Sequence, residues 1–145
     1  MKKLFLFFIF TFTATTVFSH DDNEERIKFW KEYYNPKIEA EGSSVPSVNI
    51  SLIKNKPFYQ VKTNIRNFKF TPEKNMQNNL SSEGYGKLFI NGEYVSRIYS
   101  EYHFVKILPV GINEIKVILS SNLDHDVSHN GKVISDTITY QFPEY

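Results

Sequence analysis

The sequence predicts an all-β protein: an antiparallel sandwich of immunoglobulin-like or cupredoxin-like type, with about seven or eight strands and a short N-terminal helix. Three observations favour this class. Apolar and polar side chains alternate in most segments after position 47, which is typical of half-buried strands. The strand-like segments recur about every ten residues. Thirteen Phe and nine Tyr against six Gly also favour strands over loops.

Residues 1–19 have the pattern of a secretory signal peptide. A basic start precedes the apolar run LFLFFIFTF (4–12), and a short, more polar stretch leads to a cut before His20. The run is shorter than the roughly 20 residues of a membrane-spanning helix, so we expect no stable membrane insertion after cleavage. An uncleaved N-terminal anchor is the alternative. The expected location is periplasmic or extracellular.

Residues 20–36 are predicted to form a short helix. Acidic residues stand in its first turn, and an Asn-Pro pair ends it. Ile27, Trp30 and Tyr34 make one apolar stripe at helical spacing. We expect this stripe to dock the helix onto the main domain. The alternative is a free helix that recruits another protein.

The main domain is predicted to span residues 47–145, after a linker at 37–46 that contains Gly, Ser and Pro. Its strands follow from the alternating pattern and from the turn residues between them. Polar segments at 71–84 and 120–132 are predicted to be long loops, where binding residues usually lie. Strands are expected at 48–52, 59–70, 86–90, 93–100, 102–107, 115–119 and 138–142.

The clearest single element is a hairpin within GKLFINGEYVSRIYS (86–100). Asn91-Gly92 stands between its two strand-like runs and supplies the positive φ angles of a type I′ turn. Asn130-Gly131 is a second turn signal of the same kind.

The strand at 115–119 makes a prediction about faces. Its three apolar residues should be buried, while the polar residues between and beside them face solvent. The buried set is Ile115, Val117 and Leu119, and the exposed set is Glu114, Lys116 and Ser120.

Composition restricts the classes of partner. Without residues 1–19, which carry two lysines and no acids, the formal charge falls from +1 to −1. A near-neutral chain argues against nucleic acid, which usually needs a basic face. The chain has no Cys, so no disulfide supports the fold, and 145 residues suit one domain, which we expect to be monomeric.

Four histidines are the main candidates for a transition-metal site, because no thiolate is present. Cleavage before His20 would place a free amine and an imidazole on one residue, a bidentate chelate that favours Cu(II). A second histidine would complete a histidine brace, as in small exported β-sandwich copper carriers and in oxidative polysaccharide-cleaving enzymes. The alternative is that the HDD sequence simply starts the mature chain.

Two further places could contribute metal ligands. DHDVSH (124–129) contains Asp124, His125, Asp126 and His129, which could converge on a metal ion from a loop. Solvated loop polarity is the alternative. His103 is flanked by aromatic residues, which favours a partly buried strand histidine over a metal ligand.

The segment EGYGKLFINGEYVSRIYSEYHFVKILPVGINEIKVILSSNLDHDVSHNGKVI resembles a family of small exported, largely uncharacterised bacterial β-sandwich proteins. The family pattern is similar to G-H-A-H-L-Y-[IV]-[DN]-G, followed by L-P-x-G-x-[HN]-x-[IV]-x-V-x-L, and NFKFTPE is similar to its F-x-F-x-P-E element. The resemblance covers residues 48–139. It implies a sandwich whose histidines gather into a metal site. Tyr85 and Lys87 stand where the family has H-x-H, whereas His103 and His125 match.

Three functions follow as hypotheses. The first is an exported, non-catalytic module that binds a protein partner or a small ligand. The second is a periplasmic copper-binding protein that uses His20, His103 and His125, with Asp124 as a carboxylate ligand. The third is a secreted enzyme of unknown reaction, and it has the least support. The sequence contains no G-x-S-x-G elbow, no phosphate-binding glycine loop and no H-E-x-x-H helix.

Overall fold

The computed structural model describes residues 36–55, 58–105 and 108–142. The predicted signal peptide (1–19) and the predicted helix, apart from its last residue, lie outside these ranges. Within them the chain is nearly all β, so the predicted all-β class is confirmed. No helix in the described ranges is long and apolar enough to cross a membrane. The elements are β1 (Lys37–Glu39), β2 (Ser47–Asn55), β3 (Phe58–Arg66), β4 (Lys69–Phe70), the 3-10 helix η1 (Pro72–Lys74), β5 (Glu83–Ile90), β6 (Glu93–Ile98), β7 (Tyr102–Val105), β8 (Gly111–Ser121), β9 (Asp126–His129), β10 (Lys132–Val133) and β11 (Ser135–Phe142).

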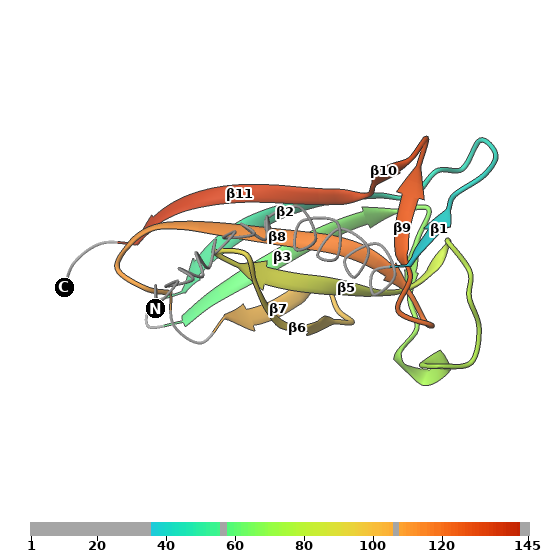
Figure 1. Ribbon diagram of the computed structural model, residues 1–145. Coiled ribbons are helices and arrows are strands. Elements are labelled where there is room, and N and C mark those ends of the chain that lie inside the picture. The colour runs from blue at the N-terminus through green and yellow to red at the C-terminus, as the bar shows by residue number, and fades with distance from the viewer. Residues whose placement is uncertain (1–35, 56–57, 106–107, 143–145) are drawn as a thin grey trace, which may run out of the picture.

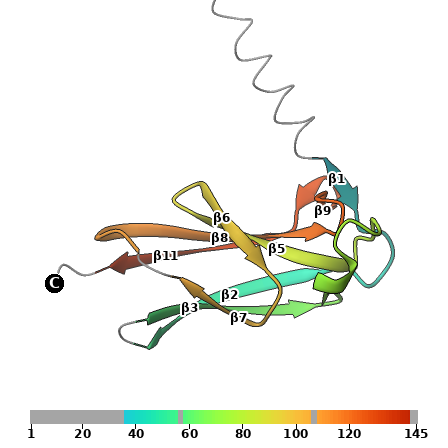
Figure 2. The ribbon, with the colours of Figure 1, turned by 90° about the horizontal axis from the view of Figure 1, so that it is seen from below.

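The strands form two sheets that lie face to face as two layers (Figures 1 and 2). The larger sheet has the order β1-β9-β8-β5-β4, with β10 beside β9, β11 beside β8 and β6 beside β5. The smaller sheet is antiparallel, with the order β2-β3-β7. The larger sheet is mixed, because β1 runs parallel to β9 and β4 runs parallel to β5. Both parallel pairings involve strands of two to four residues. The sequence pattern did not predict β1 or β9, and it placed β4 in one strand with β3, whereas β3 ends at Arg66.

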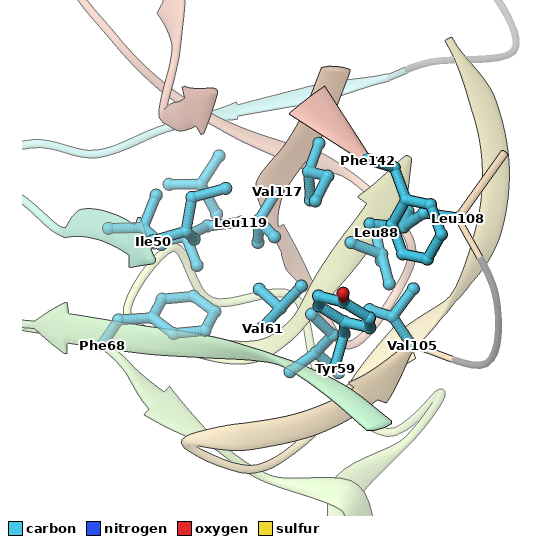
Figure 3. Packing of buried hydrophobic residues seen from close by; sticks show 14 of the residues in the cluster. Ile50, Tyr59, Val61, Phe68, Leu88, Val105, Leu108, Val117, Leu119 and Phe142 are labelled. Atoms are coloured by element: carbon cyan, nitrogen blue, oxygen red, sulfur yellow. The ribbon is translucent and has the colours of Figure 1, made fainter. Parts of the chain in front are cut away.

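The core lies between the two layers and depends most on β8. Ile115, Val117 and Leu119 are fully buried, as the alternating pattern predicts. They face the buried side chains of the smaller sheet, among them Val61 and Tyr59 (Figure 3). Burial of each large apolar side chain contributes about 1.5–3 kcal/mol. This shared core holds two sheets together in a chain that has no Cys.

The predicted hairpin is confirmed as β5 and β6. Asn91 and Gly92 have φ angles of 52° and 83°, as a type I′ turn requires. The register shifts between Leu88 and Phe89. Such a bulge increases the local twist of the pair, and here it falls in the half of the hairpin next to the turn.

Besides the mixed sheet, three expectations from the sequence differ from the structure. The segment 120–132, which was expected to be a loop, contains β9 and begins with the end of β8. The expected linker begins with a strand: Lys37–Glu39 forms β1 on β9, and the Ala40 N–H donates to the Ser128 carbonyl at 2.7 Å. The side chain of Ser120 is buried and not exposed. The reason is that its hydroxyl donates to the His125 carbonyl, where the chain folds back from β8 into β9.

A charge at the centre of β8 tests this account of the core. Val117→Asp would bury a carboxylate with no partner, and we expect it to lower the free energy of unfolding by more than about 3 kcal/mol. Ile112→Asp is the matched control, because Ile112 lies on the same strand but is 74% exposed. The control should change stability by less than about 0.5 kcal/mol. Urea unfolding measures both. A Val117→Asp variant as stable as the control would contradict the assigned faces of β8.

Candidate functional site

The edge strands of the two sheets meet along two opposite sides of the molecule, which we call seams. One of these seams is closed by direct contacts. β2 and β11 are edge strands of opposite sheets and lie side by side. The backbone N–H of Ile50 donates to Oδ2 of Asp136 at 2.7 Å. Lys54 Nζ, also on β2, lies 4.5 Å from the ring centroid of Tyr140 on β11. A charge-assisted hydrogen bond and a cation–π contact therefore join the sheets along this side.

The opposite seam, between β6 and β7, is open. A groove of about 750 Å³ runs along it, which is within the usual size range of ligand sites. Ser96 Oγ of β6 and His103 Nε2 of β7 are hydrogen-bonded at 2.9 Å and bridge the two sheets at the groove. The described residues that line the groove are Ile90, Asn91, Glu93, Tyr94, Val95, Ser96, His103, Phe104, Val105 and Pro109.

Exposed aromatic side chains line this groove. Phe104 is 64% exposed and Tyr94 is 55% exposed, and they come from opposite walls. Phe58 of β3 packs edge-to-face on Phe104, with ring centroids 6.3 Å apart. It extends the aromatic surface beyond the groove. Large apolar side chains that gather on a surface mark a binding site more often than isolated ones do.

Both walls of the groove are also edge strands. Among the described residues, β6 pairs only with β5, and β7 pairs only with β3. An edge strand presents backbone N–H and C=O groups that can pair with an added strand. An open strand edge and apolar side-chain positions beside it are the two features by which proteins bind extended peptides.

His103 is one of the predicted metal ligands, and the structure places it in this groove. Burial lowers the pKa of His103 below its ordinary value, which favours the neutral imidazole. Its Nε2 is engaged with Ser96. His103 therefore serves, in this structure, as a neutral link between the sheets.

Asp124 belongs to a second cluster, on the outer face of the larger sheet. Lys87 Nζ lies 3.0 Å from Oδ1 of Asp124 and 2.8 Å from Oδ1 of Asp126. The Tyr85 hydroxyl donates to the same Asp124 oxygen. Burial, and then the hydrogen bond to Asp124, raises the pKa of Tyr85. Partial burial alone would raise the pKa of Asp124, but hydrogen bonds from Tyr85 and Lys87 hold it below its ordinary value.

The remaining predicted ligands are not brought to one place by the described residues. His125 Nδ1 is hydrogen-bonded to Asn79 Nδ2 at 2.7 Å, at the loop end of the molecule, whereas His103 lies in the smaller sheet. No group of three His, Asp or Glu side chains in the described ranges is arranged to hold a metal ion. His20 lies outside those ranges. The copper site with His20, His103, His125 and Asp124 stays a prediction.

Sequence reasoning missed the groove and the salt-bridged cluster. The sequence predicts Phe104 and Tyr94 only as residues of strands. No local pattern shows that the edge strands of two different sheets lie far enough apart to leave a groove between them. Tyr85 and Lys87 were noted only as departures from a histidine pair. The sequence does offer one signal for this cluster. Lys87 is a charged residue within a predicted strand, and the predicted loop at 120–132 contains acidic residues that could pair with it.

The chain has no significant match among protein-family models, curated proteins or solved structures.

Removal of the Lys87 ammonium tests the cluster. Lys87→Met would leave the buried Asp126 carboxylate without a counter-charge, and we expect a loss of about 3–5 kcal/mol in the free energy of unfolding. The double variant Lys87→Met/Asp126→Leu should recover most of that loss, because the one carboxylate left without Lys87, that of Asp124, has a side chain 55% exposed to solvent.

Lys62→Met is the control, since the Lys62–Glu101 pair is solvent-exposed and should contribute less than about 1 kcal/mol. Denaturant titrations compare the four proteins. If Lys87→Met cost no more than Lys62→Met, or if the double variant were less stable than the single one, the proposed role of Lys87 would be wrong.

Proposed function

We propose that this protein is a non-catalytic binding module that holds an extended, apolar peptide segment of a partner protein in the groove between β6 and β7. The observation that carries the proposal is the difference between the two seams. The β2–β11 seam is closed by contacts between its strands. The β6–β7 seam leaves a groove with exposed aromatic walls and two strand edges.

The groove suits a peptide better than the long polar segments at 71–84 and 120–132 do. Many polar side chains in those segments are used inside the protein. Asn122 Nδ2 donates to Thr71 Oγ1 and to Asn78 Oδ1, and Lys74 donates to both carboxylate oxygens of Glu83. A partner would have to replace these hydrogen bonds. Phe104 and Tyr94, in contrast, expose apolar surface that gains stability on burial.

The chemistry of the groove defines the partner segment. Side chains of an added strand alternate between the groove and solvent, so every second residue should be apolar or aromatic. Glu93 is the charged side chain among the described lining residues. A basic residue near one end of the segment would complement it.

The proposal also includes the type of fold and the location of the protein. The two layers share one core, and this supports an immunoglobulin-like or cupredoxin-like sandwich. The signal-peptide pattern of residues 1–19 supports action after export, on a partner outside the cytoplasm.

Selection from a phage-displayed library of random heptapeptides tests the proposed function. Peptides enriched on the wild-type protein should carry apolar or aromatic residues at alternate positions. They should bind Phe104→Ser at least about tenfold more weakly, because an exposed aromatic anchor at an interface is typically worth more than 1.4 kcal/mol. Fluorescence polarisation with the labelled peptides measures both affinities.

Leu80→Ser is the matched control, because Leu80 is also exposed but lies in the loop before β5. It should leave the affinity unchanged. Failure to enrich any alternating peptide, or equal losses in the two variants, would refute the peptide-binding groove.

A further inference from the structure

The described part of the chain begins beside a second hollow, on the outer face of the larger sheet. This hollow, of about 350 Å³, is lined by Lys87, Phe89, Tyr94, Arg97 and Asp124. The Asp126 N–H donates to the carbonyl of Pro36 at 2.8 Å. The side chain of Asp126 in turn pairs with Lys87 on the wall of the hollow. Whatever precedes Pro36 therefore enters the domain next to this hollow.

The hollow combines an aromatic surface with a guanidinium group. Phe89 and Tyr94 pack edge-to-face, with ring centroids 5.8 Å apart. Arg97 lies over the Tyr85 ring, 4.3 Å from its centroid, and donates to Asn75 Oδ1 at 2.8 Å. None of the ion pairs within the described ranges includes Arg97. Aromatic edges beside a guanidinium suit an indole ring with carboxylates near it.

The segment before Pro36 carries that chemistry in its sequence. Trp30 is the one Trp of the chain, and residues 21–25 contain four carboxylates. Trp30 stands six positions before Pro36, which is about 9 Å along the axis of the predicted helix. Trp30 is therefore held within two helical turns of Pro36, whose carbonyl accepts from Asp126 beside the hollow. The excess of carboxylates complements Arg97.

We propose that the hollow formed by Phe89, Tyr94 and Arg97 is the docking site of the chain's own residues 20–35, with Trp30 as the side chain that enters it. Ile27 and Tyr34, which share the apolar stripe of Trp30 in the sequence, lie beside it on the outer face of the sheet. The segment covers this face of the larger sheet. Tyr94 lines both the hollow and the groove, so the docked segment borders the groove at Tyr94 and leaves Phe104 on the β7 wall accessible.

The fluorescence of Trp30 tests the docking, because no other Trp contributes. In the full chain, Trp30 should show blue-shifted emission and severalfold weaker quenching by acrylamide than free N-acetyltryptophanamide. Phe89→Ser and Arg97→Gln should each shift the emission to the red and increase quenching. Arg97 does not line the β6–β7 groove, so Arg97→Gln should leave peptide binding there unchanged.

Tyr102→Ala is the matched control, since it removes an exposed aromatic ring from the smaller sheet. It should leave the emission unchanged, and far-UV circular dichroism verifies that each variant is folded. Wild-type quenching equal to that of the free compound would overturn the proposal. So would protection that neither hollow variant reduces, or protection that grows with protein concentration, which would assign the site to a second copy of the chain.

Discussion

The fold depends on one strand that is paired on both sides and buried on its inner face. β8 hydrogen-bonds to β5 on one side and to β11 and β9 on the other, and its apolar side chains fill the space between the layers. Because β8 fixes β5 in place, it also fixes the β5–β6 hairpin, whose outer strand forms one wall of the groove. The binding surface that we propose is thus held by the most buried part of the molecule.

The asymmetry between the two seams follows from which side chains reach across them. Asp136 and Tyr140 extend from β11 to β2 and join the sheets there. At the other seam, within the part of the chain that the structure describes, the side-chain hydrogen bond between the sheets is the one between Ser96 and His103. The aromatic residues of that seam, Tyr94 and Phe104, are more than half exposed. A gap with apolar walls is the result, and burial of those walls by a partner is favourable.

Local sequence patterns predicted the longer strands. They did not predict the pairings between strands that are far apart in the sequence. Asn91-Gly92 identified a hairpin because a type I′ turn needs two adjacent residues with positive φ. The alternation in β8 identified a buried face. In contrast, β1 pairs with β9 across about 90 residues of sequence, and strands of two to four residues are too short to show a period. The groove was not predictable for a related reason: β6 and β7 belong to different sheets, and only the tertiary arrangement separates them.

Hydrogen exchange of backbone amides in the presence of a selected heptapeptide tests the central claim, that a partner segment binds along the edges of β6 and β7. The account predicts slower exchange at residues 93–98 and 102–105 on peptide addition, with the polar segments at 71–84 and 120–132 unchanged. Protection confined to those two polar segments would contradict it and would move the binding surface to the loop end of the molecule.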